Sequence, residues 1–141
     1  MEEVIMNTAK TLELLQSEAA YTRMCELYGA EKAEENIRRY GELVKKFREN
    51  FGENDILMFS SPGRTEISGN HTDHNHGKVL AGSINLDCVG IAARNESSRV
   101  NIISETFQQK FTIDLNDLQP SDKKAGTVDL VKGLLKGFQE S

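Results

Sequence analysis

Apolar residues recur at helical spacing through the first part of the chain. Between residues 31 and 51 they alternate steps of four and three, which places them on one face of a helix. They are Ala33, Ile37, Tyr40, Val44, Phe47 and Phe51. An upstream set predicts another helix that ends near Gly29. Its members are Leu12, Leu15, Ala19, Met24 and Leu27. The pattern predicts two antiparallel helices within residues 1–54.

From residue 55 onward, short apolar and alternating runs replace the helical spacing. These runs are residues 56–59, 79–81, 84–93, 100–104 and 110–115. The first precedes Pro62-Gly63 and predicts a strand that enters a turn. The second and third are continuously apolar and partly β-branched, which predicts buried strands. Polar turns join the last runs, so the pattern predicts a meander of mostly antiparallel strands.

A final helix is predicted near residues 127–138, where apolar residues return to helical spacing. Thr127 is the expected N-cap, and Asp129 suits the positive N-terminal end of the helix dipole. Helices and antiparallel strands together predict an α+β fold. We expect residues 1–54 to be a helical N-terminal extension, and residues 55–141 to form the part of the chain that carries the chemistry.

Composition and charge exclude several classes of protein. The 141 residues are 38% hydrophobic and 28% charged, which is typical of a globular chain rather than a collagen-like or disordered one. A net charge of -5 disfavours binding to duplex DNA. No segment approaches the roughly 20 apolar residues of a membrane span. Cys25 and Cys88 lie far apart and predict no disulfide framework, so a reducing, cytoplasmic location is expected.

The candidate chemistry is concentrated between residues 60 and 82. All three histidines (His71, His74 and His76) lie within six positions of a glycine-rich loop. Together with Asp73 they could supply ligands to zinc or iron. A polar small molecule is the other possibility, because Asp73 can accept two hydroxyl hydrogen bonds and Arg64 offers a fork suited to phosphate. Asn75 and His76 could instead merely cap turns.

The same stretch resembles the first signature motif of galactokinases, which belong to the GHMP kinase superfamily. The resemblance lies in Pro62-Gly63-Arg64, Gly69-Asn70-His71-Thr72-Asp73, Gly77 and Val79-Leu80, and extends more weakly over about residues 56–138. In the family motif, valine and asparagine follow the arginine, and a glutamate precedes the histidine. This chain has Thr65 and Glu66 at the first two positions and Asn70 at the third.

The resemblance implies a reaction and a set of site residues. Galactokinases transfer the γ-phosphoryl group of ATP to the anomeric hydroxyl of galactose. Arg64 is implied to be catalytic and to lie beside the reacting hydroxyl. The substrate-binding residues implied are Arg64, Asn70, His71 and Asp73. Because Asn70 keeps hydrogen bonding but loses the charge of the family glutamate, the resemblance implies galactose or a related sugar rather than galactose alone.

The family's glycine- and serine-rich phosphate loop does not occur in residues 1–141. The resemblance therefore implies the N-terminal, sugar-binding portion of a longer galactokinase, inactive alone. The ATP and Mg²⁺ of the whole enzyme would bind to residues outside this chain. A non-catalytic, galactokinase-like sugar sensor is an alternative, and a metal-binding domain built on the histidines and Asp73 is another. We expect no nucleic-acid or membrane partner, but self-association through uncovered apolar strand faces.

Overall fold

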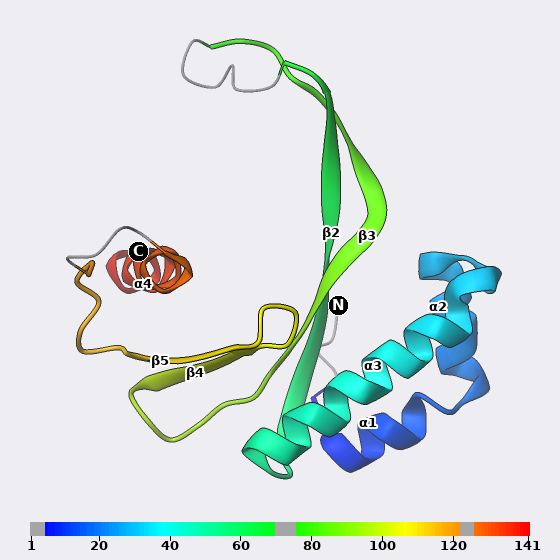
Figure 1. Ribbon diagram of the computed structural model, residues 1–141. Helices are drawn as coiled ribbons and strands as arrows, with labels where there is room; N and C mark the ends of the chain where they lie inside the picture. The colour runs from blue at the N-terminus through cyan, green and yellow to red at the C-terminus, as the bar shows by residue number, and fades with distance from the viewer. Residues whose placement is uncertain (1–4, 70–75, 122–125) are drawn as a thin grey trace. The chain divides into compact units, whose positions relative to one another are not determined.

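The computed structural model describes residues 5–69, 76–121 and 126–141. The chain forms two compact units, Met1–Arg94 and Asn95–Ser141 (Figure 1). Elements of the first unit are β1 (Met6–Asn7), α1 (Thr8–Leu14), α2 (Glu18–Tyr28), α3 (Ala30–Phe51), β2 (Asp55–Ser68) and β3 (Leu80–Ala92). Elements of the second are β4 (Arg99–Ser104), β5 (Gln109–Asp114) and α4 (Thr127–Glu140). Helices with antiparallel strands confirm the predicted α+β class.

The long helix α3 matches the predicted apolar stripe, whereas the single upstream helix that we expected is two helices. Ser17 separates α1 from α2: its backbone is extended, and its hydroxyl accepts a hydrogen bond from the backbone N–H of Ala20 at 3.2 Å. A serine in this geometry caps the helix that follows and cannot continue the one before. The second helix ends at Gly29, as predicted, where φ is +84°.

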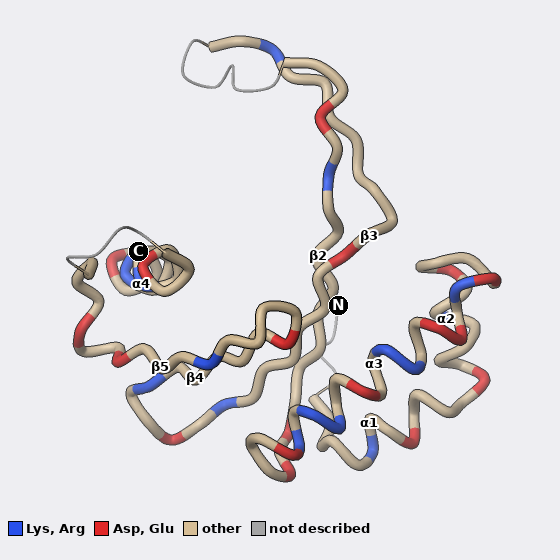
Figure 2. Tube along the Cα trace, in the orientation of Figure 1, with Lys and Arg blue, Asp and Glu red and all other residues tan. Residues whose placement is uncertain are grey.

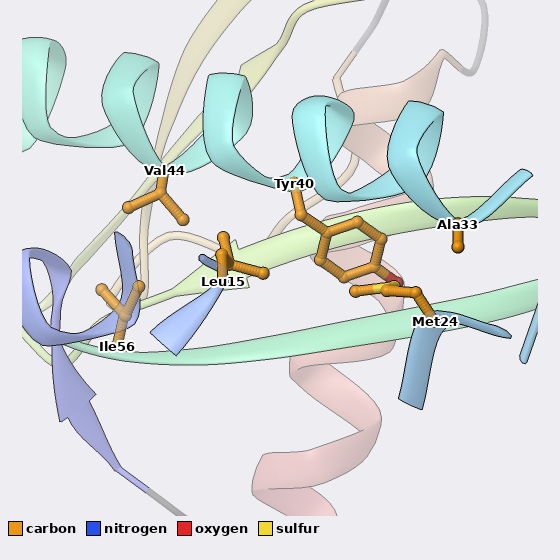
Figure 3. Close-up of a cluster of buried hydrophobic side chains, with 6 residues drawn as sticks. All are labelled: Leu15, Met24, Ala33, Tyr40, Val44 and Ile56. Atoms are coloured by element: carbon orange, nitrogen blue, oxygen red, sulfur yellow. The ribbon is translucent and has the colours of Figure 1, made fainter. Parts of the chain in front are cut away.

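The core of the first unit lies between these helices and the start of β2. Its buried side chains are Leu15, Met24, Ala33, Tyr40, Val44 and Ile56 (Figure 3). Along α3 from Ala33 to Val44, the facing side chains run from Met24 to Leu15, in reverse chain order. The predicted antiparallel packing of the helices is therefore confirmed. Ile56 places the base of β2 in the same core, while the predicted boundary near residue 54 stays a prediction.

Strand β2 continues through Pro62-Gly63, so our expectation of a turn at that point is wrong. It pairs with β3 in an antiparallel ladder whose register shifts between Pro62 and Arg64. Pro62 pairs with Asp87 and Arg64 with Ser83, so three residues of β3 face Gly63 alone. Such a bulge accommodates proline, which cannot donate to the ladder. Pro62 and Gly63 therefore remain within β2, and the extra residues of β3 opposite Gly63 form the irregularity.

The runs at 79–81 and 84–93 were expected to be separate buried strands, and they form the single strand β3. Among the described residues, little covers it: Leu80 is 59% exposed and Leu86 is 70% exposed. Its recorded ladder partner is β2, and β2 carries exposed apolar side chains as well, Phe59 and Ile67 among them. The expectation of burial is therefore wrong for much of this hairpin.

The second unit consists of the β4–β5 hairpin and helix α4. The predicted helix is confirmed, but Gly126 is its N-cap, and Thr127 already lies inside it. Asp129 occupies the first turn, as expected, and accepts hydrogen bonds from the backbone N–H and hydroxyl of Ser121. This carboxylate therefore ties the preceding loop to the first turn of the helix.

Candidate functional site

Charged residues are sparse along strands β2 and β3, in contrast to the helices (Figure 2). They are Asp55, Arg64 and Glu66 in β2 and Asp87 in β3. Asp55 lies at the base of the hairpin, whereas the other three lie at or beyond the bulge opposite Gly63. The charged groups of these strands, apart from Asp55, are therefore found from the bulge onward.

Gly63 lies at the bulge, where β3 approaches its backbone closely. A Cβ at this position would lie 3.1 Å from the Ile84 side chain and 3.2 Å from the carbonyl oxygen of Leu86. These separations are tighter than most Cβ contacts, so the Ile84 side chain and the Leu86 backbone would have to shift by a few tenths of an ångström to admit a larger residue. Arg64 follows immediately, and the close approach of the strands fixes where its backbone lies.

Arg64, the predicted catalytic residue, projects from β2 with its side chain 74% exposed. Its guanidinium Nη2 donates to a carboxylate oxygen of Glu66 at 3.2 Å. The two residues are two positions apart on one strand, so their side chains share a face. Glu66 is less exposed, at 27% of its side chain. The guanidinium of Arg64 is therefore exposed and forms an ion pair with Glu66.

The other predicted sugar-binding residues, Asn70, His71 and Asp73, lie outside the described residues. So does His74 of the metal alternative. His76 is described and exposed, with a φ of +59°. Within the described ranges, no group of three or more His, Cys, Asp and Glu residues is placed to hold a metal ion. Because most of the proposed ligands lie outside those ranges, the metal alternative stays untested.

Asp87 is the centre of a polar cluster that sequence reasoning missed. Its side chain is only 5% exposed. One carboxylate oxygen accepts from Arg39 Nη1 at 2.6 Å, and the other accepts from Tyr28 at 2.6 Å and from the hydroxyl of Ser60. Arg39 Nη2 also donates to the backbone carbonyl of Asp87 at 2.9 Å. The cluster therefore ties α2 and α3 to both strands of the hairpin.

A second tyrosine extends the cluster. The hydroxyls of Tyr28 and Tyr40 lie 2.7 Å apart. Because Tyr28 donates its single proton to Asp87, Tyr40 must be the donor of this bond. Burial, with the hydrogen bonds to Asp87 and Tyr40, raises the pKa of Tyr28 above its ordinary value. Tyr28 therefore stays protonated and keeps donating. A sequence signal did exist, since Asp87 is the single charge within the apolar run 84–93.

Opposing effects act on the pKa of Asp87. Burial alone would raise it, but hydrogen bonds from Ser60, Tyr28 and Arg39, with the charge of Arg39, outweigh burial and hold the pKa below its ordinary value of 3.8. Desolvation favours the neutral acid, whereas donated hydrogen bonds and a nearby cation favour the carboxylate. The carboxylate is thus the form that the folded structure stabilises.

This lowered pKa makes folding stability depend on pH. A depressed pKa contributes stability that is complete above the unfolded value and is lost as the pH falls through the folded value. We expect the difference in unfolding free energy between the parent chain and Asp87→Asn to shrink between about pH 5 and pH 2. Urea unfolding of both proteins across that range measures this difference. The contributions of the other acidic groups to the pH dependence are the same in both proteins and cancel. A difference independent of pH would contradict the assignment.

Comparison with known proteins supports the resemblance of residues 62–80 to the galactokinase motif. Residues 45–94 match the galactokinase galactose-binding signature. The chain is 33% identical over 101 residues to a galactokinase from Clostridium tetani (strain Massachusetts / E88), covering 72% of the chain and 26% of the relative. It is 36% identical over 104 residues to a galactokinase from Lactococcus lactis subsp. lactis (strain IL1403), again covering 72% and 26%.

The chain spans about a quarter of the length of these curated relatives. No solved structure matches it significantly. Within the described residues, no helix is long and apolar enough to cross a membrane. The signature match and the relatives confirm that this chain resembles the galactokinase family, over a portion of that family's length.

Proposed function

We propose that this chain is the N-terminal, sugar-binding part of a galactokinase-like enzyme that phosphorylates the anomeric hydroxyl of galactose or a related sugar with ATP. The galactose-binding signature at residues 45–94 carries the proposal, because it contains both the hairpin bulge and Arg64. The relatives of this chain are named galactokinases, which supports the reaction class. The helices at residues 1–54 are proposed to support this part rather than to bind substrate.

Arg64 is proposed to polarise the reacting sugar hydroxyl or to steady the charge that develops on the transferred phosphoryl group. A guanidinium is permanently charged and offers a rigid fork of donors, which suits either role. Its exposure leaves it accessible to a ligand. Asn70, His71 and Asp73 are proposed to hold the sugar hydroxyls, with Asp73 as the charged acceptor. Together they would orient the hydroxyl beside Arg64.

The residues of this chain do not fit an ATP site. Phosphoryl transfer depends on positioning phosphates and Mg²⁺, which backbone N–H groups of a glycine-rich loop commonly provide. The sequence contains no loop of the family type. No step involving ATP is therefore assigned to these residues, and the chain alone is proposed to be inactive as a kinase.

Titration of the 141-residue chain with galactose tests the proposed function. We expect millimolar binding, about -4 kcal/mol, because other sugar contacts would lie elsewhere in a whole enzyme. Asp73→Ala should weaken binding at least tenfold, since loss of a charged acceptor costs about 1.5–3 kcal/mol. NMR chemical-shift titration measures both, with Glu96→Ala in the second unit as the exposed control.

Two results would contradict the proposal. One is equal galactose affinity for the parent chain and Asp73→Ala, which would remove Asp73 from the site. The other is micromolar binding of ATP·Mg²⁺ by the 141-residue chain, which would reverse the assignment of this part to sugar binding. If galactose binds, phosphorylation assays on a longer gene product distinguish the two remaining functions. Phosphorylated sugar would indicate a kinase, and binding without phosphorylation would indicate the non-catalytic sensor.

A further inference from the structure

The outer edge of strand β2 is a described feature that the proposed roles do not use. Strand β1 pairs with this edge only at Asp55 and Ile56. From residue 57 to 68, the ladder partner recorded for β2 among the described residues is β3, which lies on the opposite edge. Each residue from 64 to 68 is exposed overall. Such an edge presents backbone N–H and C=O groups with which another strand can pair.

The regular part of this edge is short. The β2–β3 ladder shifts register between Pro62 and Arg64 and again between Glu66 and Ser68. Between the two shifts, residues 64–66 pair one to one with residues 81–83 of β3. Bulges bend and twist a strand, so another strand can add in regular register only along this segment. The edge of β2 therefore offers a bounded pairing site.

The charges within this segment complement themselves. When a strand pairs antiparallel with its own copy about a two-fold axis, one residue faces its own counterpart, and the residues on either side of it face each other. An axis at Thr65 places Arg64 of each copy opposite Glu66 of the other. An axis one residue away would place Arg64 against Arg64, or Glu66 against Glu66. Opposite charges directly across a ladder are favourable and like charges are unfavourable, so the charge pattern selects the axis at Thr65.

The side chains of the segment are available for this contact. Arg64 is 74% exposed, and its recorded hydrogen bond to Glu66 uses Nη2. Because a guanidinium carries five N–H donors, Arg64 can keep this bond and still donate to a carboxylate of a second copy. In the same register Ile67, which is 67% exposed, lies opposite Gly63 of the second copy, where no side chain obstructs it.

We propose that β2 pairs antiparallel with β2 of a second copy of this chain, about a two-fold axis at Thr65. The two hairpins then form one sheet in the order β3–β2–β2–β3. Because few residues pair, the association is weak and reversible, as is typical of interfaces below about 1,200 Å². The inference does not depend on the proposed function, since it uses only the strand edge and its charges.

Charge reversal in the 141-residue chain tests this register. The variants are Arg64→Glu, Glu66→Arg and the double variant Arg64→Glu/Glu66→Arg. Each single variant sets like charges against each other at both symmetric contacts, whereas the double variant restores opposite charges. A mixture of the two single variants restores them as well, because each copy supplies the charge that the other needs. Lys45→Glu and Glu96→Arg reverse exposed charges elsewhere and match the net charges of the two single variants.

We expect sedimentation velocity to show a concentration-dependent equilibrium between monomer and dimer for the parent chain. Each single variant should weaken association about tenfold, because two attractive cross-strand pairs become repulsive. The double variant and the mixture should return to within about threefold of the parent, because opposite charges face each other again. Both controls should resemble the parent. Amide hydrogen exchange at residues 64–66 should slow as the parent concentration rises.

The double variant adds a test that does not require the single variants to fold. It should pair with itself but not with the parent chain, because a mixed pair would set like charges against each other. Three results would overturn the proposal: a parent chain that stays monomeric at millimolar concentration, equal association of the parent and both single variants, or growth beyond the dimer. Free mixing of the parent with the double variant would overturn the register.

Discussion

Replacing Asp87 with alanine is expected to lower the free energy of unfolding of the first unit by about 3 kcal/mol. The substitution removes the acceptor of Arg39, Tyr28 and Ser60 in one step. It leaves two hydroxyl donors and a cation without their partner in a region where the Asp87 side chain is 5% exposed. Breaking a buried pair is costly for this reason, and the partial exposure of Arg39, at 43%, places the effect at the lower end of the usual range.

Urea unfolding followed by circular dichroism measures this loss. Asp87→Asn should show an intermediate loss, because its amide oxygen still accepts from a hydroxyl while the charge of Arg39 is unpaired. Glu49→Ala, which removes an exposed carboxylate from α3, is the matched control and should remain within about 0.5 kcal/mol of the parent. A loss for Asp87→Ala no larger than for Glu49→Ala would show that the cluster does not stabilise the first unit.

Replacing Gly69 with alanine is expected to destabilise the far end of the hairpin by about 3 kcal/mol and to abolish detectable galactose binding. Its φ of +89° is unfavourable for any residue with a Cβ. The added Cβ would lie 2.9 Å from Val79 Cα and closer still to the carbonyl oxygen of Lys78. Since both contacts are backbone atoms, the strands themselves would have to separate, directly before the predicted sugar-binding residues.

Gly82→Ala is the matched control on the same hairpin. Gly82 pairs with Thr65, and a Cβ there would meet nothing within 4 Å. Amide hydrogen exchange of the hairpin and galactose titration measure the two effects. Gly69→Ala should lose protection at residues near 67–69 and 78–80, whereas Gly82→Ala should resemble the parent. Similar behaviour of the two variants would show that the backbone at Gly69 is not constrained as described.

The helices could be predicted from the sequence because their signals are local. The four-and-three spacing of α3 depends on one helix alone, and its buried residues Ala33, Tyr40 and Val44 belong to the predicted stripe. The break at Ser17 was missed, although a serine with an extended backbone ahead of a helical run is a capping signal. At Ser17 the capping chemistry, and not the apolar spacing, decides where the second helix begins.

The hairpin could be predicted only in part because its irregularities depend on two strands at once. Pro62-Gly63 is typical of a turn, and only the bulge in β3 allows the strand to continue. Arg64 was predicted from the motif, whereas its contact with Glu66 required the strand geometry. Asp87 could not be assigned a role, because its partners come from helices 48 and 59 positions earlier in the chain.

The cluster around Asp87 makes the N-terminal helices and the hairpin depend on one another structurally. The galactose-binding signature at residues 45–94 already begins inside α3 rather than at the first strand. Deleting residues 1–44 would retain every residue of the signature, yet it would remove Tyr28 and Arg39 and leave the Asp87 carboxylate without these two partners. A shortened chain that began at the signature would therefore keep the residues of the motif without the contacts that anchor the hairpin to the helices.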